Sequence, residues 1–211
     1  MLQTIHCLRT RSAITEIKKL HNENIAICTL QHGAKIIDYK ECATVASYND
    51  EKLNATTLAS TFSPNGDFLA FTNGKYIFIL HLASKMMFKT IKADGEKIEH
   101  LAFDLDSKYI IASTQSGRVL QYRYDGSSLL ARLYSYNHND KSAKDKANSF
   151  AFHGNTMACG SIHGELFTIN LHSRANKVHI KNSSYTLNAL CFLDSLHLAS
   201  GDANGVIYIN S

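Results

Sequence analysis

The stretch LASGDANGVIYIN, residues 198–210, contains the pattern that decides the fold. An apolar run is followed by the turn residues Asn204 and Gly205 and then by a second apolar run, which predicts a tight β-hairpin. A two-stranded hairpin is only marginally stable in water on its own. The rest of the chain must therefore supply further strands and cover the free edge of this hairpin.

The hairpin pattern occurs five times, because similar segments lie at 24–39, 67–82, 109–124 and 156–171. Each copy holds an alanine in the first run and a glycine in the turn. The alanines are Ala26, Ala70, Ala112, Ala158 and Ala199, and the glycines are Gly33, Gly74, Gly117, Gly164 and Gly205. In both series the spacing lies between 41 and 47 residues. We expect positive φ angles in these turns, which glycine adopts without steric cost.

Each of the first four hairpins is flanked by two further strand-like runs, and the fifth is preceded by one. The preceding runs lie at 13–17, 58–62, 98–103, 148–152 and 187–192, and more polar runs follow the first four hairpins at 42–48, 85–91, 129–135 and 177–181. Units of roughly 40–45 residues with four antiparallel strands are typical of β-propeller blades. The sequence predicts an all-β chain, a single β-propeller domain over 1–211 with five blades' worth of repeats. The approximate repeats are 12–50, 56–92, 97–135, 147–182 and 186–211.

Two segments are close to the usual pattern of the WD40-repeat family. They are FSPNGDFLAF at 62–71, between the first two strands, and HLASGDANGVIYIN at 197–210, in the hairpin. The whole chain therefore resembles a divergent WD40-repeat β-propeller. It has no tryptophan, so the Trp-Asp dipeptide is absent, and the family's Gly-His dipeptide is also missing. The equivalent third-strand ends are Ile37-Asp38, Tyr122-Arg123, Ile169-Asn170 and Ile209-Asn210.

The last repeat lacks a fourth strand, which leaves two architectures open. In the first, the orphan run LQTIHCL at 2–8 adds to the last sheet and closes a five-bladed ring, which removes an exposed edge. In the second, the chain is part of a seven-bladed propeller, the blade number that the WD40 resemblance implies, and both end blades are exposed. Exposed end blades would allow a weak edge-to-edge dimer, with a monomer as the other expectation.

Composition excludes several classes of protein. The net charge is +4 and the basic residues are scattered, so we expect no nucleic-acid partner. Five cysteines without a CxxC pair indicate free thiols in a reducing compartment. The sequence has neither a secretory signal nor an apolar run of membrane-spanning length. We therefore expect a cytoplasmic protein that does not insert into membranes.

No residue pattern points clearly to catalysis, and we expect no catalytic residues, no metal site and no cofactor. Asp104 and Asp106 form either an acid–base or metal-binding pair or, as we favour, a turn whose aspartates cap their own backbone. Four histidines lie in one repeat without metal-ligand spacing: His153, His163, His172 and His179. Phosphate-binding loops and nucleophile elbows are absent from the sequence.

The WD40 resemblance implies a non-catalytic scaffold that binds a protein or peptide on one face of the propeller. The candidate binding residues between second and third strands are His32, Asn73, Gln115, His163 and Asp202. Tyrosines expected in inter-blade loops are further candidates, with packing at sheet edges as the alternative: Tyr48, Tyr136 and Tyr185. Two other functions stay open at this point, namely a hydrolase or lyase on a five-bladed propeller and a structural module of a longer multidomain protein.

Overall fold

The computed structural model describes residues 12–20, 24–29, 33–48, 58–93, 95–126, 129–135 and 146–211. Within these ranges the secondary structure consists of nineteen β-strands. A search of the same ranges finds no helix with the length and apolarity needed to span a bilayer. The prediction of an all-β fold is therefore confirmed for this part of the chain.

The strands form five antiparallel sheets, which we call blades 1 to 5. Blade 1 contains β1 (Ile14–Lys19), β2 (Asn24–Thr29), β3 (Gly33–Asp38) and β4 (Ala43–Tyr48). Blade 2 contains β5 (Ala59–Phe62), β6 (Phe68–Thr72), β7 (Tyr76–His81) and β8 (Met86–Lys92). Blade 3 contains β9 (Ile98–Phe103), β10 (Tyr109–Thr114), β11 (Arg118–Arg123) and β12 (Leu129–Ser135). Blade 4 contains β13 (Ala147–His153), β14 (Thr156–Ser161), β15 (Glu165–Asn170) and β16 (Asn176–Lys181). Blade 5 contains β17 (Leu187–Phe192), β18 (Leu198–Asp202) and β19 (Ile207–Asn210).

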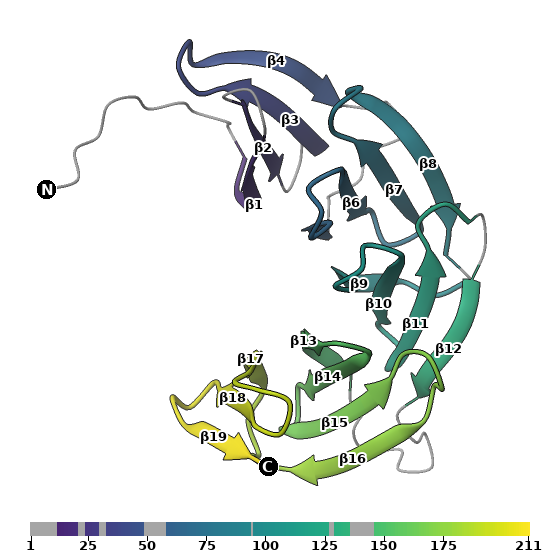
Figure 1. The fold of residues 1–211 in the computed structure, drawn as a ribbon, viewed down its shortest axis with the longest axis vertical. Coiled ribbons are helices and arrows are strands. Elements are labelled where there is room, and N and C mark those ends of the chain that lie inside the picture. Colours follow the sequence, from purple (N-terminus) through teal and green to yellow (C-terminus); the bar gives the residue numbers. More distant parts are fainter. Residues whose placement is uncertain are drawn as a thin grey trace, which may run out of the picture.

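The blades follow one another along an arc, with β1, β9, β13 and β17 on its inner side (Figure 1). The last strands of blades 1 to 4 lie on the outer side. The arc is open between blade 5 and blade 1, so the structure does not have the closed five-bladed ring that was one of the two expectations. The proposed closing strand at 2–8 lies outside the described residues. A seven-bladed architecture stays a prediction.

The hydrophobic core lies between neighbouring blades. One cluster joins blades 2 and 3 through side chains such as Ile79 and Ile98, and similar clusters join each other adjacent pair. All five residues of β6 are buried, as expected for a strand that has a blade on either side. Burial of one such Ile, Leu or Phe side chain contributes about 1.5–3 kcal/mol. Packing between sheets therefore contributes to stability at every junction between neighbouring blades.

Blade 5 differs because it has three strands among the described residues, so that its third strand, β19, is the edge of the sheet. The side chains of Ile207 and Ile209 are 74% and 66% exposed. They pair in register with Gly201 and Ala199 of β18. An uncharged strand with an open edge can pair with another strand. The predicted weak dimer would use this edge.

The second strand of each of blades 2 to 5 ends in a polar side chain that stabilises the following turn. In blades 2 to 5 these residues are Thr72, Thr114, Ser161 and Asp202, all buried. Ser161 Oγ accepts the backbone N–H groups of His163 and Glu165, and Asp202 Oδ1 accepts those of Asn204 and Val206. Thr72 and Thr114 each accept one such N–H group. This capping position lies between the repeating alanine and glycine and was not identified from sequence.

The turns on the opposite side of the blades have caps of the same kind. Ser63 Oγ accepts the N–H of Phe68 at 2.8 Å after β5. Asp194 Oδ1 accepts two N–H groups after β17, and these bonds together with His197 lower the pKa of Asp194 to about 2. The third strands of blades 1 and 4 end in Asp38 and Asn170, whose side-chain oxygens each accept two N–H groups of the next turn. Polar side chains thus fix the turns at both ends of the sheets.

The turn glycines in blades 2 to 5 have φ angles between +80° and +90°, as predicted. Gly164 and Gly205 occupy the same place in blades 4 and 5 and have nearly identical φ angles. A Cβ atom on Gly205 would meet nothing within 4 Å, whereas one on Gly164 would lie 2.1 Å from the carbonyl oxygen of Ser183.

This difference predicts unequal effects of alanine at two similar turns. Gly205→Ala is expected to lower the free energy of unfolding by about 1–2 kcal/mol, the cost of the left-handed backbone alone. Gly164→Ala is expected to cost several times more, because the backbone at Ser183 has to move. Urea denaturation of both variants measures the two losses. Equal losses would contradict the close approach of the two backbones.

Candidate functional site

The direction of the strands places two kinds of loop at the same end of a blade. In an antiparallel sheet of four consecutive strands, the turn between strands two and three lies beside the connection to the next blade. We call this end of the blades the upper face and the opposite end the lower face. Hydrogen bonds join the loops of the upper face: the N–H of Ile98 donates to Gly74 O at 2.9 Å, and the N–H of Ala203 donates to Thr186 O at 2.9 Å.

The structure places three of the predicted binding residues in upper-face turns. Asn73 closes its own turn, because its Oδ1 accepts the N–H groups of Lys75 and Tyr76. Gln115 is exposed and His163 is half-buried. His32 lies outside the described residues. The upper face is therefore chemically different from one blade to the next.

Asp202 requires a correction, because it is the last residue of β18 and does not lie in the turn. Its carboxylate accepts the hydroxyl of Ser183 at 2.6 Å and that of Tyr208 at 3.3 Å, besides the two turn N–H groups. The Ser183 hydroxyl and then the Val206 N–H are the main causes that lower the pKa of Asp202. The carboxylate therefore joins β18 to β19 and to the connection from blade 4.

The tyrosines also lie in different surroundings. Tyr48 is the last residue of β4 and packs against the core between blades 1 and 2, which agrees with the edge-packing alternative and corrects its placement in a loop. Burial raises the pKa of its phenol. Tyr185 lies in the connection between β16 and β17 and is exposed. Tyr136 lies outside the described residues.

A pocket of about 410 Å³ opens on the upper face between blades 2 and 3. The turn between β6 and β7 and the connection between β8 and β9 form its walls. Its lining includes Asn73, Gly74, Lys75, Tyr76, Lys92, Ala93, Glu96 and Lys97. Of these, sequence reasoning identified only Asn73. The sequence does contain a signal for this pocket. Lysines recur in the hairpin turn of the second repeat and along the segment that follows β8.

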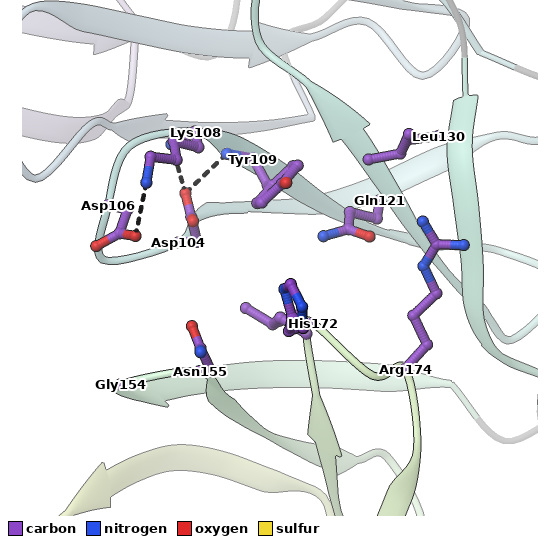
Figure 2. Close-up of a pocket in the computed structure, with 11 residues that line it drawn as sticks. Asp104, Asp106, Lys108, Tyr109, Gln121, Leu130, Gly154, Asn155, His172 and Arg174 are labelled. Carbon is purple, nitrogen blue, oxygen red and sulfur yellow. Dashed lines mark hydrogen bonds and ion pairs between the residues drawn. The ribbon is translucent and has the colours of Figure 1, made fainter.

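A second pocket, of about 430 Å³, lies on the lower face between blades 3 and 4 (Figure 2). On its blade 3 side, Asp104 Oδ1 accepts the N–H groups of Lys108 and Tyr109, both at 2.7 Å. This confirms the interpretation of Asp104 as a turn-capping residue. Burial raises the pKa of Asp104, although the two N–H groups oppose the shift. Asp106 forms a 3.1 Å ion pair with Lys108 at the exposed rim.

The blade 4 side of this lower pocket carries His172 and Arg174, which reach across it toward blade 3 (Figure 2). Gln121, at the floor, is only 1% exposed, and its Oε1 has no hydrogen-bond partner among the described residues. Acceptor groups thus face donor groups across the pocket. In the described part of the chain, no three His, Cys, Asp or Glu side chains are placed to hold a metal ion.

No protein-family model matches this sequence, and no curated protein matches it. Solved structures do share its fold. The β-propeller domain of Myceliophteria thermophila Cps50 (Swd1) superposes with a TM-score of 0.79 at 13% identity, over 98% of this chain and 67% of that one. The computationally designed protein Ika8 gives a TM-score of 0.75 at 13% identity, over 93% and 57%. The designed protein Ika4 gives 0.61 at 14% identity, over 74% and 90%. These likenesses show that the chain has a β-propeller fold.

The bonds of Asp202 predict a pH-dependent contribution to stability. Its pKa is lowered in the folded state, so the carboxylate stabilises the fold above the unfolded-state pKa of about 4, and this is lost as pH falls through the folded-state pKa. Asp202→Asn is expected to lower the melting temperature at neutral pH, and the deficit should shrink steadily in acid. Thermal denaturation across the acidic range measures the deficit, with exposed Asp106→Asn as the control. A deficit that is constant with pH would contradict the assignment.

Proposed function

We propose that this protein is a non-catalytic scaffold that binds a protein or peptide partner on its upper face. The observation that carries the proposal is the construction of that face. Capping side chains close its turns, and backbone bonds tie those turns to the connections between blades. Recognition residues on loops that are held by a rigid scaffold are a common way of building a binding surface.

Several acidic side chains interact with partners inside the protein, which supports a binding function over a catalytic one. Asp104 and Asp202 accept backbone N–H groups. Oε2 of Glu165 lies 3.0 Å from Nε2 of His179. Oε1 of Glu96 forms an ion pair with Nη1 of Arg118 at 2.6 Å. A hydrolase of the glycosidase type needs two carboxyl groups that face a substrate. The carboxylates named here each have a structural partner instead.

We further propose that the chain is a divergent WD40-type propeller. Asp38 and Asn170 support this, because they end third strands where the family has the aspartate of its Trp-Asp dipeptide, and both cap the next turn. In blade 5 the Ser183–Asp202–Tyr208 network joins the connection, the second strand and the third strand. Free thiols at the four described cysteines are compatible with the cytoplasm as its location.

The proposed face predicts the outcome of an affinity capture from a lysate of the source cell. The bait with alanine at Gln115, His163 and Tyr185 is expected to lose a protein that the unmodified bait retains. A lower-face control with alanine at Asp106 and His172 should retain it. Mass spectrometry identifies the captured proteins, and melting curves verify that all baits are folded. Loss with the lower-face bait alone, or no captured protein, would contradict the proposal.

A further inference from the structure

We propose that the upper-face pocket between blades 2 and 3 is the socket for an acidic segment of the partner, an inference that rests on the function proposed above. One apolar side chain of that segment enters the pocket. Its neighbouring carboxylates pair with the lysines around the opening.

The floor of the socket is apolar. Gly74 lines this floor with a φ of +90°, and a Cβ there would lie 3.0 Å from a methyl group of Leu58 and 3.2 Å from Cγ of Lys97, so these side chains pack directly against its backbone. Ala93 adds only a methyl group. The ring of Tyr76 is 37% exposed and lies against Phe78, with 6.1 Å between ring centroids. A partly exposed tyrosine above an apolar surface is typical of the side chains that contribute most to protein interfaces.

Three exposed lysines surround this floor, and each comes from a different segment. Lys75 lies in the turn before β7, Lys92 ends β8, and Lys97 precedes β9. Lys92 pairs in register with Tyr76, which places its stem beside the ring. Within the described residues, none of the three forms an ion pair with a carboxylate. Three ammonium groups around one apolar floor suit the carboxylates of a ligand.

The acidic residue of the same wall is already neutralised. Glu96 pairs with Arg118 at 2.6 Å and also accepts the hydroxyl of Ser116, so blade 3 satisfies its charge. Asp94, which lies outside the described residues, counts toward the local charge by sequence. The three lysines and Arg118 carry four positive charges, and Asp94 and Glu96 carry two negative charges, so this region keeps an excess of two positive charges. Charge complementarity therefore selects an acidic ligand.

The distribution of charge favours a peptide over a nucleic acid. The three lysines surround one small socket, whereas nucleic-acid binding needs basic residues along a stripe that follows many phosphates. The floor is also apolar, which suits a hydrophobic side chain. An acidic peptide with one aromatic residue satisfies both features.

The walls of the socket are fixed before any ligand binds. The N–H of Ala93 donates to Lys75 O at 2.8 Å, and the N–H of Ile98 donates to Gly74 O at 2.9 Å. Asn73 Oδ1 closes the turn by accepting two N–H groups. A preformed backbone reduces the ordering that association requires.

The test uses a fluorescein-labelled peptide with a phenylalanine between two pairs of glutamates, titrated with the full chain and followed by fluorescence anisotropy. Lys75→Glu combined with Lys97→Glu is expected to weaken binding by about tenfold or more, a loss that corresponds to about 1.4 kcal/mol per factor of ten. Lys40→Glu combined with Lys85→Glu makes the same charge change on the lower face and should leave affinity within about twofold. Replacing the glutamates by glutamine, or the phenylalanine by alanine, should also weaken binding.

Equal affinity of the socket variant and the unmodified chain would overturn the proposal, as would displacement of the peptide by an unstructured oligothymidine that binds more tightly. The socket variant also serves as bait in the lysate capture. A partner that is lost with the Gln115, His163 and Tyr185 variant but kept by the socket variant leaves the scaffold function standing and refutes the socket. Capture of no protein refutes the scaffold, while peptide titration still decides whether the socket binds acidic chains.

Discussion

Each blade of this protein is a single sheet with two apolar faces, and a face becomes buried only when another blade packs against it. The rest of the structure depends on this constraint. It explains why the middle strands are apolar along their length, why Gly160 approaches Leu187 so closely that a Cβ would lie 2.7 Å away, and why the core is a series of interfaces. A repeated unit buries these faces one after another, because each new blade covers a face of the previous blade.

Packing of this kind leaves the ends of the sheets without apolar contacts, and polar caps stabilise them instead. Thr114, Ser161 and Asp202 occupy the same place in successive blades although their side chains differ. Thr114 accepts one backbone N–H group of its turn, and Ser161 and Asp202 each accept two. The loops can then vary in the residues they expose without losing their backbone conformation, which is the property that a binding face needs.

Sequence patterns were sufficient to predict the repeats, because the alanine and glycine positions report backbone constraints that are local to each hairpin. Closure of the ring depends on contacts between the first and last blades, which no local pattern encodes, and the structure has an open arc. Asp202 was assigned to the residues between the second and third strands, yet a carboxylate that accepts turn N–H groups is equally suited to end a strand. The socket between blades 2 and 3 was not found because Lys75 and Lys97 are separated in sequence and meet only through the packing of two blades.

Blades 2, 3 and 4 each have two neighbours, whereas the described residues of blades 1 and 5 have one, and Ile17 and Ile207 are exposed at these two ends. Free energy of local opening should therefore increase from either end of the arc toward its middle, as in other structures built from stacked repeats. Amide hydrogens of β18 would exchange with solvent sooner than those of β10. The socket, which lies between two interior blades, would keep its shape during fraying of the ends.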